Sequence, residues 1–449
     1  MTAQSKDNSL IRAIWIIVSF IFVLKIFIII RISNLDISIA KGHAWLGADG
    51  ENYLKGVDGL IRDGFLSQEG ILNYWPAGYP IFISILAIFS KSQALTLLSI
   101  IQSLIFSWSI YLFCRELIHT KIRKYAVFIA LVLILNPTLS LNSMAVGYES
   151  ITASGFILIV SLILKDLRLS SRKSFIVSAL LVSSIFSLMS FFQPRLLLAA
   201  IAVLSYWTIY RLKLKRAIPA TALLLLVSFL LPTILAFRNY QITGIYSISR
   251  NLGVTMNIGA GDTTGGYVQK PPGVPCNFVG VDVTSSDNTT LTKIDNQRVV
   301  CVSKWYLTHP AKAIKLFYNK SIYFWSPWFG PEANGTMARN PWLTIHPLKN
   351  MTKSEAGLKT LYGSFGKFIS WVWIIGQLSL LFFGLASMRK LGKTESFLAN
   401  LSGVIIFSSW LVTLISIGDH RFRMPIMGLS LFLQAFGSRR ILRGSRAQV

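Results

Sequence analysis

Long apolar runs separated by short polar segments dominate the sequence. The longest runs contain about 20 residues, which is enough for a helix to cross roughly 30 Å of hydrocarbon. The apolar runs lie near residues 11–30, 94–113, 125–141, 150–164, 174–191, 196–210, 217–237, 367–388, 397–416 and 424–437. This pattern predicts an all-α polytopic membrane protein with about ten transmembrane helices.

Composition points to the same class of protein. The chain has 449 residues, 53% of them hydrophobic and only 14% charged, and its mean hydropathy is +0.56. A soluble globular protein of this size does not have such values. The formal net charge of +26 would suggest a nucleic-acid partner in a soluble protein. Here the basic residues gather in short loops between apolar runs, so we expect them to report topology and expect no nucleic acid.

The positions of these basic residues predict which loops face the cytoplasm. Lysines and arginines cluster at 115–124, 165–173, 211–216, 389–393 and 439–446. The positive-inside rule places these segments on the cytoplasmic side. The first apolar run is long and has no small-residue cleavage site after it, so we expect a retained helix with a cytoplasmic N-terminus.

One apolar stretch conflicts with a simple count of spans. Residues 79–89 are apolar enough to suggest a span, but counting them would move the basic segment 115–124 to the outside. Giving priority to the charges, we predict that residues 76–91 form a helix on the outer membrane surface, within a first outer loop at 33–93.

The predicted spans divide the chain into three parts. Residues 1–237 form an N-terminal transmembrane module, 238–366 a small extracytoplasmic domain rich in Gly, Pro, Thr and Asn, and 367–449 the C-terminal transmembrane helices. Cys276 and Cys301 both fall in the middle part, where an oxidising compartment favours a disulfide between them over the alternative of two separate thiols. The sequence contains no Walker loop, dinucleotide-binding fingerprint or zinc-binding spacing, which argues against ATP-driven and nicotinamide-dependent proteins.

Two kinds of charged residue on the outer face suggest chemistry. Asp49 opens the first outer loop soon after the first apolar run, where a carboxylate can act as a base, although Asp-Gly is also a turn signal. Four arginines lie at outer helix ends, contrary to the positive-inside rule, and each alone could anchor a helix at the membrane interface. Together they suit an anion such as a lipid phosphate, which guanidinium groups bind through paired donors. They are Arg195, Arg238, Arg421 and Arg423.

Five stretches resemble the GT-C superfamily of membrane glycosyltransferases, in the branch of the protein O-mannosyltransferases and the lipid A aminoarabinose transferase. They occur along the chain in the order found in that family. The stretches are 49–53 with 75–80, 136–137 with 148–149, 194–195, 237–240 with the small residues that follow, and 420–425.

The resemblance implies a GT-C-like fold and a specific reaction. A sugar would pass, with inversion, from a polyprenyl-phosphate donor to an acceptor hydroxyl on the periplasmic face of the cytoplasmic membrane. The acceptor, a glycan, lipid or protein, stays open. Asp49 would act as base with Glu51 beside it, and the two could hold a divalent metal ion or act without one. The donor phosphate would be bound by Arg195, Arg238, His420, Arg421 and Arg423, and the substrates contacted by Tyr53, Tyr79, Glu149 and Asn239.

The sequence departs from the family in two places, and other functions remain open. Gly50 separates Asp49 from Glu51, where the mannosyltransferases usually have adjacent acids, and residues 238–366 show no β-trefoil repeat. A flippase or transporter for lipid-linked oligosaccharides would also need a basic cavity, but it predicts mid-membrane charges, of which Lys25 is the obvious one, and duplicated halves. An O-antigen polymerase or ligase would share outer arginines without an early acid.

Overall fold

The computed structural model of the protein describes residues 3–32, 50–260, 288–325, 354–418 and 420–446, and every regular element in these ranges is a helix. Seven helices among them are long and apolar enough to cross a membrane. The chain is therefore an integral membrane protein with an all-α fold, as its apolar runs predict. The seven are α1 (Ala3–Ile32), α5 (Ala94–Ile118), α8 (Glu149–Leu169), α9 (Arg172–Phe192), α11 (Leu214–Thr243), α16 (Ser354–Arg389) and α17 (Lys393–Ile415).

The other three expected spans are helices with shorter apolar lengths. After the short turn η2 (Arg123–Tyr125), α6 (Ala126–Leu135) ends at Asn136, whose side chain accepts a hydrogen bond from the Leu139 amide at the start of α7 (Pro137–Asn142). Pro137 has no amide hydrogen to continue α6 and suits the first position of a new helix. Helix α10 (Leu197–Arg211) has 15 residues, and α18 (Met424–Arg446) carries Arg439 and Arg440 in its second half.

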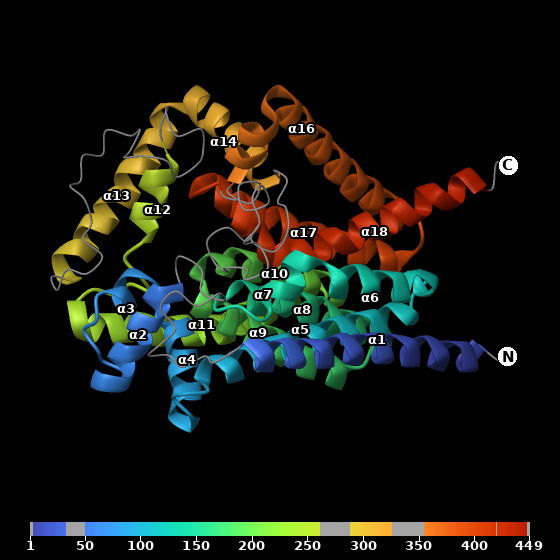
Figure 1. Ribbon diagram of the computed structural model, residues 1–449, viewed down its shortest axis with the longest axis horizontal. Helices are drawn as coiled ribbons and strands as arrows, with labels where there is room; N and C mark the ends of the chain where they lie inside the picture. Colours follow the sequence, from blue (N-terminus) through green and yellow to red (C-terminus); the bar gives the residue numbers. More distant parts are fainter. Residues whose placement is uncertain (1–2, 33–49, 261–287, 326–353, 419, 447–449) are drawn as a thin grey trace.

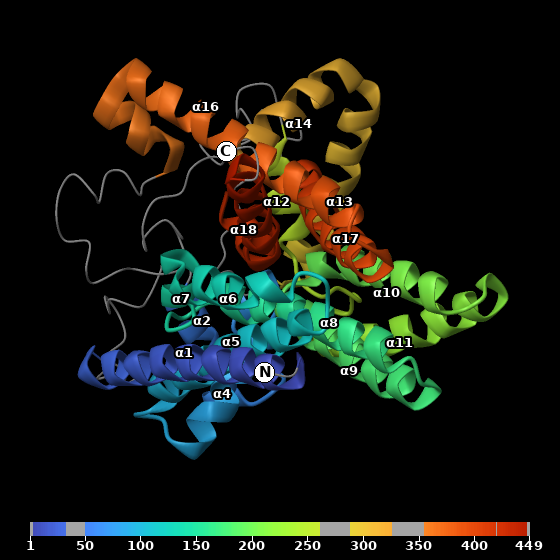
Figure 2. The same cartoon turned by 90° about the vertical axis from the view of Figure 1, so that its right-hand side faces the viewer.

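The spans pack into one bundle with a shared apolar core. Helix α1 lies along α5 and α6, α5 along α8, and α9 along both α8 and α11. Helices α17 and α18 cover another side of α8, α16 packs on both of them, and α10 joins α11 to α17. Figures 1 and 2 show this arrangement, with α1, α5, α8 and α9 side by side and α17 and α18 above them.

Shorter helices gather at one end of this bundle, which we call the outer end. It contains α2 (Gly50–Asp63), α3 (Ile71–Tyr74), α4 (Gly78–Phe89), α12 (Leu252–Gly259) and α13 (Asn288–Thr308), followed by α14 (Pro310–Trp325). Figure 1 shows α2 to α4, α12 and α13 at the left, opposite both chain termini. This is the end that the charge pattern assigns to the extracytoplasmic side.

Helix α4 accounts for the apolar stretch that conflicted with the charge pattern. Its 12 residues rise only about 18 Å at 1.5 Å each, less than a hydrocarbon core requires. The helix packs on α2, α5 and α9. Gly78 lies so close to the Phe191 carbonyl of α9 that any side chain there would clash with it. The prediction of a non-spanning helix at 76–91 therefore agrees with the observed element.

Topology can be tested at two exposed serines. Ser92 follows α4 at the outer end, and Ser170 links α8 to α9 at the opposite end. If the basic loops are cytoplasmic, a membrane-impermeant maleimide added to intact cells should label Ser92→Cys and leave Ser170→Cys unlabelled until the cells are opened. The unsubstituted protein gives the background from its own three cysteines. Equal labelling of the two variants in intact cells would contradict the assignment.

Candidate functional site

A cavity of about 430 Å³ lies at the outer end, between the bundle and the short helices. Its walls come from segments far apart in the sequence, all of which are predicted to lie on one side of the membrane. The lining residues include Tyr53, Trp75, Tyr148, Arg195, Asn251, Asp295 and Phe422. Of the site residues predicted from the sequence, Tyr53 and Arg195 line this cavity.

One wall is a cluster of aromatic rings around Tyr53. The Tyr53 ring lies 5.1 Å from Trp75, 5.2 Å from Tyr79 and 6.4 Å from Tyr148, between ring centroids. The last two contacts are edge-to-face, a favourable arrangement for aromatic pairs. Rings held on several sides lose little further freedom when a ligand packs against them, so this wall is preorganised.

Tyr79 lies beneath this wall and fixes the second outer loop. Its hydroxyl donates to Gln102 Oε1 at 3.1 Å and accepts from the Gly147 amide at 2.8 Å. Gln102 in turn donates to the Ala145 carbonyl at 2.7 Å. Burial raises the pKa of Tyr79 well above its ordinary value, so the hydroxyl stays protonated and keeps its donor role. Tyr79, which was predicted to contact substrate, is not among the residues that line the cavity. It packs behind Tyr53 and supports the aromatic wall.

Glu149 follows Tyr148 and is the first residue of α8. It is 2% exposed and lies close enough to Tyr79 to raise the pKa of that hydroxyl. The cavity lining contains Tyr148 but not Glu149. The structure therefore brings Glu149 to the same corner as Tyr79 without exposing it to the cavity.

Arg195 lies in the short turn η3 (Pro194–Leu196) and faces the last outer turn, η5 (His420–Arg423). Its guanidinium carbon stands 3.6 Å from the centroid of the Phe422 ring, in cation–π geometry. This contact joins two of the predicted arginine-bearing segments. Arg423 is buried, with Nη1 3.5 Å from Gln377 Oε1, and does not line the cavity. The side chains of His420 and Arg421 lie outside the described part of the structure.

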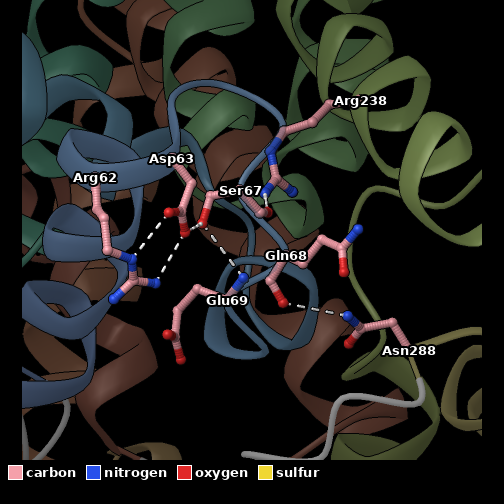
Figure 3. Close-up of polar contacts among 7 residues, drawn as sticks. All are labelled: Arg62, Asp63, Ser67, Gln68, Glu69, Arg238 and Asn288. Atoms are coloured by element: carbon pink, nitrogen blue, oxygen red, sulfur yellow. Dashed lines mark hydrogen bonds and ion pairs between the residues drawn. The ribbon is translucent and has the colours of Figure 1, made fainter.

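Arg238 differs from the expectation that it binds phosphate. Its fully buried guanidinium donates to the carbonyls of Phe65 at 2.8 Å, Ser67 at 2.6 Å and Leu72 at 3.3 Å. Further bonds reach the side-chain oxygens of Asn73 and Asn239. Figure 3 shows Arg238 directed at Ser67. Each of the Nε, Nη1 and Nη2 atoms of Arg238 is engaged by protein oxygens, so this residue holds the first outer loop instead of lining the cavity.

Asn239 supports the opposite side of the same corner. Its amide nitrogen donates to the carbonyls of Ser247 at 2.8 Å and Ile248 at 3.1 Å, both of which belong to residues that line the cavity. Asn239, which was predicted to contact substrate, is 2% exposed and is not part of the lining. Together Arg238 and Asn239 join the end of α11 to two walls of the cavity.

Asp295 is a lining residue that the sequence analysis missed. Its two carboxylate oxygens accept hydrogen bonds from the amides of Gly253 at 3.0 Å and Val254 at 2.8 Å. These amides belong to the first turn of α12, where a negative charge is favourable. Burial raises the pKa of Asp295, and the two amides act in the opposite direction. The one available signal was weak: Asp295 is the sole acid in the 21-residue helix α13.

Asp49 lies outside the described residues, immediately before the first residue of α2. Tyr53, in the first turn of α2, lines the cavity. Glu51, in the same turn, is half-buried. Within the described residues, no group of three His, Cys, Asp or Glu side chains is arranged to hold a metal ion.

The predicted disulfide falls partly outside the described residues. Cys301 is disulfide-bonded. Cys276, its predicted partner, lies in a segment that the structure does not describe. Cys114 is a free and buried thiol.

No protein-family model matches the chain, and no curated protein is similar to it in sequence. A solved structure that matches is the oligosaccharyltransferase of Archaeoglobus fulgidus, tethered through a disulfide bond with an acceptor peptide that contains the NVT sequon. The match covers 95% of this chain and 50% of the archaeal one, at 12% identity and a TM-score of 0.44. The chain thus spans about half the length of that protein, and its function has to be inferred from its own residues.

The role of Arg238 can be tested through stability. Arg238→Ala removes the donors from three carbonyls, those of Ser67 and Leu72 in buried residues, and each buried group left unsatisfied costs about 1–3 kcal/mol. We expect a lower thermal unfolding midpoint in detergent and new protease cleavage within residues 64–73. Arg216→Ala, an exposed arginine in the same helix, is the matched control and should change neither. A stable Arg238→Ala protein that has lost only lipid-phosphate binding would instead restore the phosphate role.

Proposed function

We propose that this protein is an integral membrane glycosyltransferase of GT-C type, which transfers a sugar from a polyprenyl-phosphate donor to an acceptor hydroxyl in the outer cavity. One observation carries the proposal. A single cavity combines an aromatic wall, an arginine and the first turn of α2, the helix that follows Asp49 in the sequence. The charge pattern assigns all of these segments to one membrane face. These are the groups that this reaction requires.

The size and lining of the cavity suit a sugar. A volume of about 430 Å³ falls within the range of small-molecule sites. The rings of Tyr53, Trp75 and Tyr148 offer flat surfaces for the apolar faces of a sugar ring, while Asn251 and Asp295 provide polar groups for its hydroxyls. Orientation within the site would come from the polar side, because stacking alone leaves a sugar free to slide.

Arg195 lines the outer cavity, and we expect its guanidinium to bind the donor phosphate. Its contact with Phe422 positions it beside η5, the turn that also carries His420 and Arg421. As the glycosidic bond to phosphate breaks, negative charge accumulates on the phosphate oxygen. A cation fixed beforehand at that point stabilises the transition state more than the ground state.

Asp49 is proposed as the general base. It would take the proton of the acceptor hydroxyl while that oxygen forms a bond to the anomeric carbon. The bond between the anomeric carbon and the phosphate oxygen breaks, and its electron pair stays with the released polyprenyl phosphate. Attack from the side opposite the phosphate inverts the anomeric centre. Glu51, half-buried in the first turn of α2, would add a second negative charge near the base.

The geometry of Lys25 favours a transferase over a flippase. A transport path needs ionisable groups within the membrane, and Lys25 was the candidate. Its ammonium donates to Ser143 Oγ at 2.9 Å and lies 4.3 Å from the centroid of the Phe106 ring. The first contact ties the second outer loop to α1, and the second packs α1 on α5, so Lys25 has a structural role that does not require transport.

The base can be tested with a matched pair of substitutions in one segment. Asp49→Asn should lower turnover by at least about 10²-fold, since general-base catalysis contributes about that much, while expression and donor binding stay close to wild type. Asp58→Asn changes an exposed acid of α2 and should keep full activity. The measurement is release of polyprenyl phosphate from a panel of polyprenyl-phosphate hexoses and pentoses in detergent. Retention of more than a tenth of wild-type turnover by Asp49→Asn would contradict the base role.

Arg195 separates the transferase from the flippase. Arg195→Ala should reduce both donor affinity and the rate of phosphate release, and Arg195→Lys should restore them only in part because an ammonium lacks the paired donors. Lys91→Ala, an exposed outer cation, is the control. The assay uses detergent, where no lipid has to cross a leaflet, beside vesicles that report translocation. Translocation in vesicles without any release of polyprenyl phosphate in detergent would overturn the transferase proposal.

A further inference from the structure

A second cavity, of about 480 Å³, lies at the opposite end of the bundle from the outer cavity. It is formed by the C-terminal ends of α10 and α16 and the first turns of α17. Its polar lining residues include Tyr206, Tyr210, Arg389, Lys390, Lys393 and Asn400. None of these residues has a part in the transfer reaction proposed above.

The cations of this cavity differ from their neighbours in being unpaired. Elsewhere at this end of the bundle, arginines form ion pairs with buried acids, as Arg168 does with Glu116 at 2.9 Å and Arg211 with Asp166 at 3.3 Å. In the described part of the chain, no carboxylate lies within ion-pairing distance of Arg389, Lys390 or Lys393. Three positive charges therefore share one cavity, and none of them has an ion-pair partner among the described residues.

The nearest acid is already engaged by another segment. Glu395, in the first turn of α17, is 3% exposed and accepts a hydrogen bond from the Lys121 amide at 2.7 Å. The Lys121 ammonium donates to the Leu391 carbonyl at 2.7 Å. Formally, Glu395 and Lys121 cancel, which leaves the charge of the three lining cations. Such a cavity attracts an anion from its surroundings.

The wall of the cavity holds Arg389 in a defined position. Arg389 Nε donates to Asn400 Oδ1 at 2.7 Å, which leaves both Nη groups without a partner among the described residues. The rings of Tyr206 and Tyr210 pack on Phe397, with centroids 5.1 and 4.3 Å away. Helix α17 begins beside them without a side-chain cap, so its first amides and its dipole add to the positive potential.

The position of the cavity identifies the kind of anion. It lies where two membrane-crossing helices, α16 and α17, end, and tyrosines are common at this depth of a membrane. Exposed apolar side chains lie on the same helices: Ile209, 53% exposed, precedes Tyr210 in α10, and Phe382, 59% exposed, lies two turns before Arg389 in α16. A phosphate held in the cavity thus has apolar protein surface on its membrane side, where acyl chains would lie.

We propose that this cavity binds the headgroup of an anionic phospholipid. The lipid phosphate would bind the free donors of Arg389 and the ammonium groups of Lys390 and Lys393, and the acyl chains would follow the exposed apolar surface of α10 and α16. Basic pockets between transmembrane helices bind anionic headgroups in this way. The bound lipid would fix the junction of α16 and α17, and α17 contributes Val412 and the following Ser416 to the outer cavity.

The test uses native mass spectrometry of the full-length protein in detergent, titrated with phosphatidylglycerol, phosphatidylcholine or inorganic phosphate. We expect wild-type protein to prefer phosphatidylglycerol over phosphatidylcholine by at least about tenfold. Each basic residue near an anionic group contributes roughly fivefold, so Arg389→Gln with Lys393→Gln should weaken phosphatidylglycerol binding about 25-fold. Phosphatidylcholine binding should change little.

A matched control separates a defined site from general positive charge. Lys213→Gln, Lys215→Gln and Arg216→Gln together remove three exposed cations from the start of α11, and this variant should keep the lipid preference. Asn400→Leu keeps every charge but releases Arg389, and should weaken binding if the site is preorganised. Should the double and triple variants lose the preference equally, the cations are only a sorting signal and the proposal fails. Competition by inorganic phosphate at the affinity of the lipid would likewise overturn the lipid assignment.

Discussion

The outer cavity depends on how one buried guanidinium satisfies the backbone of the first outer loop. Moving a cation out of water costs several kcal/mol unless its hydrogen bonds are replaced. Arg238 replaces them with three carbonyls between residues 65 and 72 and two side-chain oxygens. The carbonyls of the buried residues Ser67 and Leu72, in turn, would lose this donor without it. Arg238 therefore fixes the end of α11 against the segment that leads to Trp75.

A row of polar side chains on α5 satisfies backbone carbonyls of the second outer loop in a similar way. Ser99, Gln102 and Ser103 donate to the carbonyls of Met144 at 2.6 Å, Ala145 at 2.7 Å and Ser143 at 3.2 Å. Irregular backbone is tolerated at membrane depth only where the protein itself satisfies it. This row of side chains lets residues 143–148 leave helical geometry inside the bundle, which places Tyr148 in the aromatic wall.

Sequence patterns predicted the fold better than they predicted the site. Apolar runs predict that helices exist, because each span must satisfy its own backbone hydrogen bonds. They do not predict where each helix ends, and the end of α6 depends on one proline, Pro137. The outer arginines were recognised as exceptions, yet position along the chain could not distinguish Arg195, which lines the cavity, from Arg238, which binds carbonyls. Asp295 was missed because its partner amides, in α12, are some 40 residues away in sequence. Asp49, central to the predicted chemistry, lies outside the described residues.

The groups around each cation show whether it serves membrane topology, folding or ligand binding. A count of basic residues along the sequence does not distinguish these three roles. Arg168 and Arg211 face buried acids, so their charge is neutralised within the protein and adds little to any ligand. Arg238 faces carbonyl dipoles, which satisfy its donors without cancelling its charge. Arg389 keeps two donor groups with no partner in the described chain, in a cavity that has no acid to balance it. Because an unpaired cation gains most from an external anion, the pairing of a basic residue is better evidence for binding than its place in a basic loop.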